Sequence, residues 1–340
     1  MMMETEGLPP EEAVWQLVNA SWITHVVRAM AVLGLADQLA SGPRTVVELA
    51  EATGTNAPAL SRLLRVLVDL RVCARDEGDR VRLTEVGEFL RSDVPGSVWA
   101  SVLAIHAPYM EQVWGELPEA VRTGEPVFSR VHSLGYWDYL TAHPEESARF
   151  DAAMTGSSEK RARALLAARD LSDLGTLVDI GGGQGRLLAV ALAATPGLRG
   201  MLFDRPEVLP AAESFLASVG VRERCDLVGG DFFEAVPAGG DAYVLAQIVH
   251  DWPDEQAVAI LRSCYQAMAP GTRVWLMEQV IEPGGASAQA NLLDLVMLIN
   301  FGAQERTAQE YRILLEAAGF HDVTVHTTPS PWSIVEAVRP

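Results

Sequence analysis

Five polar residues stand where buried strands in the second half of the chain are expected to end. They are Asp179, Asp204, Asp231, His250 and Glu278. The carboxyl ends of parallel strands meet at one edge of a sheet, and ligands bind in the crevice outside that edge. A carboxylate there can accept hydrogen bonds from a ligand, and a histidine can take up a proton near neutral pH. We therefore expect these side chains to line one ligand-binding rim.

A glycine turn follows the first of these strands. Its glycines at positions 181, 183 and 185 carry no Cβ, so the backbone can approach a ligand closely. A dinucleotide-binding fingerprint, G-x-G-x-x-G, would need a small residue where the chain has Arg186. The spacing therefore disfavours a dinucleotide, and a plain strand-to-helix turn remains the alternative to a ligand-binding loop.

Alternating strands and helices must position these residues, and this alternation predicts a parallel sheet with helices on both faces. The last helix is expected to begin with a capping box of Thr307 and Glu310 and to end at Gly319. We expect strands at 177–180, 201–204, 226–228, 242–245, 274–277, 322–327 and 333–338. We expect helices at 185–194, 206–219, 257–268 and 307–318.

The region 1–100 has the pattern of a winged helix: an apolar helix over 14–33, then helices at 45–52 and 58–70 and a hairpin at 72–83. Such a domain can bind DNA, and its second short helix carries Arg62 and Arg65. The chain, however, has 45 acidic and 26 basic residues and a net charge of −19, which repels nucleic acids and anionic membranes. We therefore expect neither as a partner. We expect a second subunit to bury part of the first helix, which carries Trp15 and Trp22, with burial in its own domain as the alternative.

The region 101–170 is predicted to be helical and to connect the first domain to a third region, 171–340. Helical patterns cover 99–111 and 113–122. The aromatic-rich stretch 135–145 leads into a helix that carries Phe150, Met154 and Ser158. Aromatic and methionine side chains suit flat, apolar ligands, although core packing is the alternative for each of them.

Three cysteines, Cys73, Cys225 and Cys264, form no C-x-x-C pair, which indicates reduced thiols in a cytosolic protein and no zinc site. Residues 1–6 lack the apolar segment of a signal peptide. No run of about 18 apolar residues is present, so we expect no membrane-spanning segment.

Five segments occur in order along the second half of the chain: 179–185, Phe203-Asp204-Arg205-Pro206, Gly229-Gly230-Asp231-Phe232-Phe233, His250-Asp251-Trp252-Pro253-Asp254-Glu255 and Glu305-Arg306-Thr307. Together they resemble the caffeate-type, metal-independent small-molecule O-methyltransferases, which include many bacterial antibiotic-tailoring enzymes. The resemblance covers nearly the whole chain. It implies an α/β fold with a C-terminal Rossmann-like class I methyltransferase domain and a mostly helical, winged-helix N-terminal domain that dimerises.

The resemblance implies S-adenosylmethionine as the cofactor, with S-adenosylhomocysteine as its product. Asp204 would accept hydrogen bonds from both ribose hydroxyls, and Asp231 and Phe232 would contact the adenine. Ser158 would lie near the cofactor carboxylate, and the glycine turn would face the methionine portion. The implied cofactor-binding residues are Asp179, Gly181, Gly183, Asp204, Asp231, Phe232, Gln247 and Ser158.

The resemblance also implies His250 as the general base, flanked by Glu278 and Glu305, which would orient the ring and stabilise its cation. An imidazole with a pKa near 6.5 is a neutral base at physiological pH, whereas a phenol has a pKa of about 10. The implied acceptor-binding residues are Trp137, Phe150, Met154, Asp251, Met297, Asn300 and Phe301. The chain departs from plant relatives at Ala246, where they have a basic residue, and in a turn between Met297 and Glu305 that is one residue shorter.

The expected function is methylation of a hydroxyl, phenolic by preference, on a small aromatic metabolite by a cytoplasmic homodimer. No metal is implied, because His250 has no second ligand at useful sequence spacing. A metal-dependent catechol-type enzyme, a C- or N-methyltransferase, and a non-methylating relative that hydroxylates or rearranges its substrate are the alternatives.

Overall fold

The computed structural model describes residues 7–282 and 288–340. It divides into two compact units, one of residues 1–111 and 143–156 and the other of residues 112–142 and 157–340. The middle region expected at 101–170 is thus shared between the two units. Residues 1–6, on which the expectation of no signal peptide depends, lie outside the described residues.

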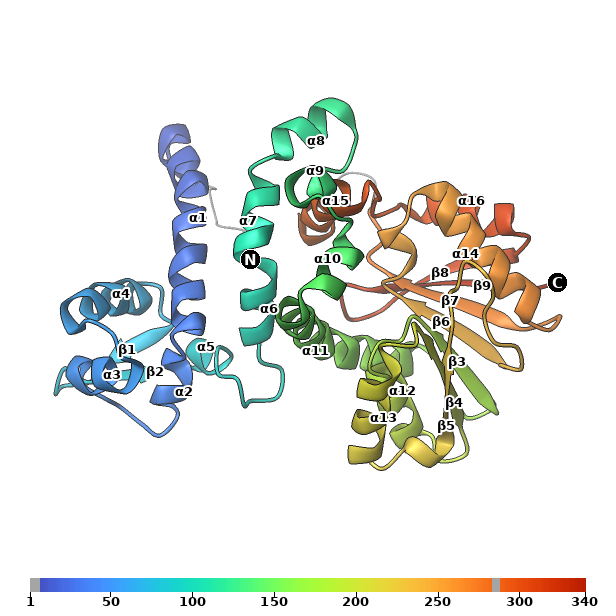
Figure 1. Ribbon diagram of the computed structural model, residues 1–340, viewed down its shortest axis with the longest axis horizontal. Helices are drawn as coiled ribbons and strands as arrows, with labels where there is room; N and C mark the ends of the chain where they lie inside the picture. The colour runs from blue at the N-terminus through green and yellow to red at the C-terminus, as the bar shows by residue number, and fades with distance from the viewer. Residues whose placement is uncertain (1–6, 283–287) are drawn as a thin grey trace. The chain divides into compact units, whose positions relative to one another are not determined.

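The N-terminal unit contains the predicted helix-turn-helix and hairpin. Thr45 and Glu48 form a capping box at the start of α3, and the side chain of Asn56 accepts the N–H of Ala59 at the start of α4. The hairpin pairs Cys73 with Leu83. The elements are α1 (Pro10–Val32), α2 (Leu35–Leu39), α3 (Val46–Thr53), α4 (Ala57–Asp69), β1 (Cys73–Arg75), β2 (Val81–Leu83), α5 (Glu85–Glu88) and α6 (Trp99–Ile105) (Figure 1).

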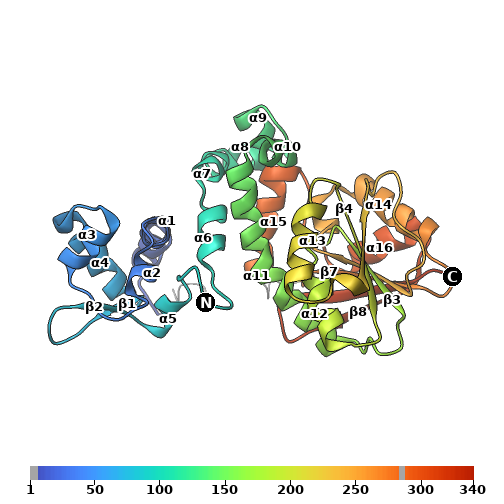
Figure 2. The ribbon, with the colours of Figure 1, turned by 60° about the horizontal axis from the view of Figure 1, so that its bottom comes forward.

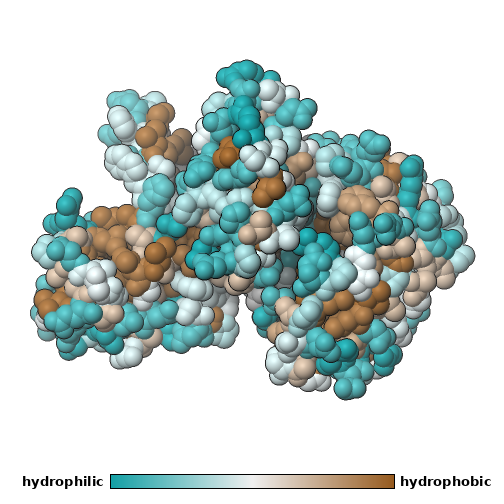
Figure 3. Space-filling model, viewed as in Figure 1, coloured by the Kyte–Doolittle hydropathy of each residue, from teal (hydrophilic) through white to brown (hydrophobic). Residues whose placement is uncertain are grey.

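The first half of α1 keeps an apolar surface exposed. Trp15 and Trp22 are 60% and 65% exposed, and Val14, Leu17 and Val18 are also exposed. Figure 3 shows hydrophobic side chains over α1 on the face that it draws. An apolar surface of this kind on a helix indicates a protein–protein contact. No helix among the described residues is long and apolar enough to cross a membrane.

The helical middle of the chain is more broken than its sequence pattern predicts. The helix expected over 99–111 ends at Ile105 and resumes at Pro108, because a proline disfavours helical backbone in the residue before it. The pattern at 113–122 is also interrupted, between Trp114 and Leu117. The helices that follow are α7 (Pro108–Trp114), α8 (Leu117–Thr123), α9 (Phe128–His132), α10 (Tyr136–Ala142) and α11 (Pro144–Ala168).

Within the described residues, the C-terminal unit has a seven-stranded sheet in the order β5-β4-β3-β6-β7-β9-β8. The pairs from β5 to β7 are parallel, whereas β9 is antiparallel to both β7 and β8. All seven predicted strands are present: β3 (Thr176–Ile180), β4 (Arg199–Asp204), β5 (Cys225–Gly229), β6 (Ala242–Ala246), β7 (Arg273–Glu278), β8 (His321–Thr327) and β9 (Ser333–Val338). From β3 the strand order runs to β4 and β5 on one side and to β6 and β7 on the other. The carboxyl end of β3 is therefore the topological switch point of the sheet, where ligands bind in folds of this kind.

Helices cover both faces of this sheet (Figure 2). Val178 and Ile180 belong to a core cluster with α14 and α16, whereas Leu177 belongs to a second cluster with α11, α12 and α13. Because both faces are covered there, the central strands β3, β6 and β7 are mainly apolar, whereas the edge strand β8 is mostly polar. The helices of the unit include α12 (Arg186–Ala194), α13 (Leu209–Ser218), α14 (Asp254–Ala267), α15 (Ala288–Phe301) and α16 (Ala308–Ala318), with the 3₁₀ turns η1 (Arg222–Arg224) and η2 (Val249–Asp251).

Two helices of this unit differ from the prediction. α13 begins at Leu209 instead of 206, so Pro210, not Pro206, occupies its first turn. α15 was not predicted, because its residues are apolar without a clear helical stripe. Met297, Asn300 and Phe301 therefore lie in a helix, and the expected turn begins only at Gly302, whose φ of +63° ends the helix.

Candidate active site

The glycine turn and Asp204 meet at the carboxyl edge of β3 and β4. Gly181 and Gly183 have φ values of +69° and +58°, which glycine adopts without strain. The N–H of Gly183 donates to Oδ2 of Asp204 at 2.7 Å, and the N–H of Arg205 donates to Oδ1 at 2.7 Å. Burial raises the pKa of Asp204, and these two N–H groups oppose the rise. The turn and the carboxylate thus form one polar surface beside the switch point.

Asp179 lies beneath the turn and not on its surface. It is 1% exposed, and a Cβ at Gly182 would stand 2.5 Å from its Oδ2 atom. That Oδ2 atom has no hydrogen-bond partner among the described residues. Burial, with the charge of Asp204, raises the pKa of Asp179 to about 7, and Arg161 opposes the rise. Asp179 therefore supports the turn from below.

Asp231 and Phe232 follow β5 at the same edge. Asp231 is exposed, and its Oδ1 accepts the N–H of Phe233 at 2.8 Å, so it caps the local turn. Phe232 is half-buried and packs edge-on against Trp252, with ring centroids 5.8 Å apart. The predicted adenine contacts therefore flank a small aromatic cluster.

Arg161, which was not predicted as a site residue, lies one helical turn after Ser158 on α11. Its Nη2 donates to Oγ of Ser158 at 2.8 Å, and its guanidinium lies 5.6 Å from the ring centre of Trp332. It is 7% exposed, and its Nε has no partner among the described residues. Burial lowers the pKa of Arg161 to about 10, against the opposing charges of Glu278, Asp179 and Asp251. A buried arginine with a spare donor can bind a carboxylate. The position of Arg161 three residues after Ser158, a predicted site residue, was the sequence signal that could have identified it.

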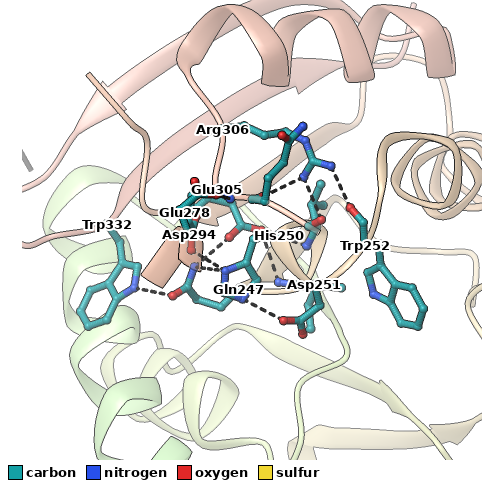
Figure 4. A network of polar contacts seen from close by, with 12 residues as sticks. Gln247, His250, Asp251, Trp252, Glu278, Asp294, Glu305, Arg306 and Trp332 are labelled. Atoms are coloured by element: carbon teal, nitrogen blue, oxygen red, sulfur yellow. Dashed lines mark hydrogen bonds and ion pairs between the residues drawn. The ribbon is translucent and has the colours of Figure 1, made fainter. Parts of the chain in front are cut away.

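His250 lies in η2, just beyond β6, with carboxylates at both ring nitrogens (Figure 4). Nδ1 is 2.6 Å from Oε1 of Glu305, and Nε2 is 3.3 Å from Oδ1 of Asp251. Burial lowers the pKa of His250, but the charges of Asp251, Glu305 and Glu278 outweigh burial and raise it to about 10. The unperturbed value near 6.5 used for the sequence-based expectation is therefore too low for this ring, because three carboxylates stabilise its cation.

Glu278, at the end of β7, holds the backbone that leads to His250. Its Oε1 accepts the N–H groups of Val249 at 3.0 Å and Ile248 at 3.3 Å, and its Oε2 accepts Nε2 of Gln247 at 2.8 Å. Burial raises the pKa of Glu278, and the charge of His250 opposes the rise. Glu305 contacts the imidazole, whereas Glu278 positions the segment that carries it.

Arg306 donates hydrogen bonds to backbone carbonyl oxygens of the loop that carries His250. This fully buried arginine donates to the carbonyl oxygens of Val249 at 3.1 Å and Trp252 at 2.8 Å, and its Nη2 lies 2.7 Å from Oδ1 of Asp254. Asp294 accepts the N–H of Glu305 at 2.8 Å. Arg306 was assigned only to a helix start. The predicted capping box of Thr307 and Glu310 is present at the start of α16, directly after Arg306.

Comparison with known proteins gives consistent matches over this fold. A family model of the O-methyltransferase domain matches residues 114–321, and one of the O-methyltransferase dimerisation domain matches residues 15–93. The chain is 38% identical to "Phenazine O-methyltransferase PhzM" of Lysobacter antibioticus, over 97% of each chain. It is 37% identical to "8-amino-8-demethylriboflavin N,N-dimethyltransferase" of Streptomyces davaonensis, over 92% of this chain and 91% of the relative.

A solved structure is similar as well. It is that of the O-methyltransferase NcsB1 from neocarzinostatin biosynthesis, in complex with S-adenosylmethionine and 2-hydroxy-5-methyl naphthoic acid. It superposes with a TM-score of 0.79 at 36% identity, over 93% of this chain and 95% of that one.

The chain belongs to the O-methyltransferase family. The family and the fold class expected from the sequence are confirmed. The winged-helix region coincides with the family's dimerisation domain, which favours the dimer over DNA binding as the role of this O-methyltransferase's N-terminal unit.

The residues predicted to bind the acceptor fall into two groups. In the C-terminal unit, the rings of Trp137 and Phe301 stack with centroids 5.6 Å apart, Tyr136 packs edge-on against Phe301, and Asp251 lies beside the histidine. Met297 and Asn300 are buried nearby in sequence on α15. Phe150 and Met154 lie on the part of α11 that belongs to the N-terminal unit, and their role stays a prediction.

Two further potential metal ligands lie close to His250 in space, although none stands at a useful spacing in the sequence. One ligand atom each from His250, Glu278 and Glu305 lies within 4.8 Å of the others. These residues are far apart in the chain, so sequence spacing could not show the cluster. The N–H donors around Glu278 and the 2.6 Å contact between Nδ1 and Glu305 already engage these atoms, which fits a hydrogen-bonded base better than a metal centre.

Proposed function

We propose that this O-methyltransferase transfers a methyl group from S-adenosylmethionine to a hydroxyl of a small aromatic metabolite, with His250 as the general base. The observation that carries the proposal is the buried pair of His250 and Glu305 at the sheet edge that also holds the glycine turn and Asp204. The base and the proposed donor-binding surface thus lie at one edge of the sheet, as in-line methyl transfer requires.

The residues present fit the donor. Asp204 can offer a carboxylate to the ribose hydroxyls, and we propose Asp231 and Phe232, at the same edge of the sheet, as the contacts of the adenine. The spare Nε donor of Arg161, beside Ser158, suits the carboxylate of the methionine portion. When bound, the donor supplies an electrophilic methyl group on a sulfonium.

The base works through Nε2. The ring acts as a base in its neutral form, in which Nδ1 donates to Glu305 and Nε2 can take the acceptor's proton. Because the nearby carboxylates raise the pKa of His250 to about 10, the ring must lose its own proton before it acts, and Glu305 then stabilises the cation that forms again. Asp251, 3.3 Å from Nε2, can orient the acceptor hydroxyl at the same point. General-base catalysis of this kind contributes about 10²- to 10⁴-fold.

The acceptor class follows from the aromatic lining and the relatives. The stacked pair of Trp137 and Phe301, with Tyr136, offers ring faces and edges to a flat molecule. By their names, two of the relatives are a phenazine O-methyltransferase and a dimethyltransferase of an aminoriboflavin, and the solved relative is a complex with a naphthoic acid. We therefore propose a fused or substituted aromatic phenol as the acceptor.

An N-methyltransferase is the second candidate, because one relative is an N,N-dimethyltransferase at 37% identity. An aromatic amine loses its proton after the methyl group is attached, so it needs the base less than a phenol does. C-methylation and non-methylating chemistry stay alternatives that the buried base pair does not favour.

We propose that the protein acts as a homodimer joined through its N-terminal unit, supported by the exposed apolar surface of α1 and the match to the dimerisation domain. Its three cysteines are buried and free, which supports the expected reducing, cytoplasmic compartment.

Formation of S-adenosylhomocysteine tests the function. Purified protein is incubated with S-adenosylmethionine and matched pairs of aromatic phenols and amines on phenazine and naphthoate frameworks, and the product is followed by chromatography and mass spectrometry. A phenol methylated in preference to its amine counterpart supports the proposal. Preferred turnover of the amine would favour the second candidate, and binding of the donor without any methylated product would contradict both.

A further inference from the structure

Gln247 has an uncommon backbone conformation at the end of β6. Its φ of +58° lies in the left-handed region, which non-glycine residues adopt only where surrounding contacts enforce it. Its N–H donates to the carbonyl of Met277 at 3.0 Å. Strained backbone of this kind clusters at functional sites.

Both ends of the Gln247 side chain are engaged (Figure 4). Oε1 accepts the indole N–H of Trp332 at 3.2 Å, and Nε2 donates to Oε2 of Glu278 at 2.8 Å. The amide orientation is fixed by chemistry, because an indole N–H can only donate and a carboxylate can only accept. Gln247 therefore spans Trp332 and Glu278, and its contact with the donor, which the resemblance implied, stays a prediction.

The contacts of Glu278 extend this connection to the base. Its carboxylate accepts three N–H groups, one from Gln247 and two from the backbone of Ile248 and Val249. Val249 precedes His250 in η2. Trp332 directly precedes β9, and Ser333 of β9 pairs with Glu278 of β7. The strand pairing therefore holds Trp332 close to the position of Glu278 along the sheet.

We propose that Gln247 and Trp332 form a positioning pair that holds Glu278, and through it the backbone of the general base, in the geometry needed for methyl transfer. The inference rests on the function proposed above and goes beyond it, because neither residue touches the ring nitrogen that takes the proton. Nε2 of Gln247 lies 3.5 Å from Nδ1 of His250, but that nitrogen is already paired with Glu305.

The pair also has an electrostatic consequence. The N–H of Gln247 lowers the pKa of Glu278, so its loss favours the protonated carboxyl. Protonation of Glu278 removes one of the negative charges that raise the pKa of His250. Disruption of the pair should therefore shift the titration of His250 to lower pH.

Four variants test the proposal. Trp332→Phe keeps an aromatic ring but removes the indole N–H, and we expect kcat to fall about fivefold. Gln247→Leu removes a hydrogen bond to a carboxylate, and we expect kcat to fall about 10- to 100-fold. Because both residues act through one connection, the double variant should be no slower than Gln247→Leu, within about twofold. Gln247→Gly, which suits the positive φ, should lose as much kcat as Gln247→Leu while retaining the fold.

Trp275→Phe is the matched control. Trp275 is also buried, and its indole donates to Glu336 at 2.7 Å, away from the histidine. We expect its loss to leave kcat within about twofold of the wild type. Binding of S-adenosylhomocysteine, measured by calorimetry, should change little in any of these variants.

The titration of His250, followed by NMR with S-adenosylhomocysteine bound, separates this proposal from the proposed function because it needs no turnover. A lower His250 pKa in Gln247→Leu than in the wild type and in Trp275→Phe supports the pair. An unchanged pKa, wild-type kcat, or additive losses in the double variant would overturn it. Absence of turnover in the wild type, with the shift in titration present, would contradict only the proposed function.

Discussion

The Nδ1 atom of His250 and the Oε1 atom of Glu305 lie 2.6 Å apart, and both side chains are buried. This contact fixes which ring nitrogen bears the hydrogen and leaves Nε2 for the acceptor. It also places a carboxylate where the imidazolium needs it after proton transfer. The pair can therefore orient the base and stabilise its charged form at once.

Removal of either partner should reduce turnover without loss of donor binding. We expect His250→Gln to lower kcat about 10²- to 10⁴-fold, because the general base is lost. Glu305→Gln should lower kcat less, about 10- to 100-fold, because it loses a charge-assisted hydrogen bond but keeps the imidazole. Steady-state kinetics and calorimetry with S-adenosylhomocysteine measure the two effects.

Exposed residues offer controls with the same chemical change. His321 on β8 and Glu316 on α16 are both exposed, and His321→Gln and Glu316→Gln should leave kcat at the wild-type level. If Glu305→Gln reduced kcat as little as Glu316→Gln does, the pair would have no part in the reaction.

The charge of the donor should lower the pKa of His250. The ring titrates near pH 10 in the free protein because three carboxylates stabilise its cation. A sulfonium nearby repels that cation, whereas S-adenosylhomocysteine is neutral at sulfur. We expect the pKa to be lower with S-adenosylmethionine bound than with S-adenosylhomocysteine bound, so that the donor itself promotes the neutral base.

Two measurements check this expectation. NMR titration should give the highest pKa of His250 in the free protein and a lower pKa with S-adenosylhomocysteine bound. The pKa should be lowest with S-adenosylmethionine bound. The rate should rise with pH until the ring in the donor complex is neutral. Equal pKa values in the two complexes would place the sulfonium too far from His250 for in-line transfer.

The elements that position the site were accessible from the sequence because each is specified locally. The strand pattern, the glycine turn and the capping box at Thr307 depend on neighbouring residues, and the structure contains all of them. α15 escaped prediction because a helix buried on several sides has no single apolar stripe to recognise.

Contacts between distant segments could not be derived in the same way. Nothing near Arg306 in sequence shows that its guanidinium reaches the carbonyls of Val249 and Trp252. The raised pKa of His250 likewise requires carboxylates from three separate segments. The family resemblance supplied the residues that we propose to face the ligand, whereas the contacts that support them became visible only in the folded chain.

Removal of metal should leave activity intact, although three potential ligands lie within 4.8 Å of one another. Glu278 already accepts N–H groups from Gln247 and Val249, and Oε1 of Glu305 is paired with His250, so a cation would have to displace these bonds. We expect unchanged kcat after dialysis against a chelator, with metal content below one per chain by elemental analysis. Activity lost on chelation and restored by a divalent cation would establish the metal-dependent alternative.

The exposed surface of α1 should control the oligomeric state. Trp15 and Trp22 lie on the same helix and are 60% and 65% exposed, an unusual exposure for tryptophan in a monomer. A glutamate at both positions would place charges in an apolar contact, so Trp15→Glu combined with Trp22→Glu should convert a dimer to a monomer. Light scattering coupled to size-exclusion chromatography measures the mass.

Ile313→Glu provides the comparison, because Ile313 is an equally exposed apolar residue on α16 of the other unit. It should leave a dimer intact, since the dimerisation model matches residues 15–93 alone. A wild-type mass of one chain, or dissociation caused by Ile313→Glu and not by the double tryptophan variant, would move the interface away from α1. Dissociation by the tryptophan variant alone would assign the contact to the apolar surface that this helix leaves exposed.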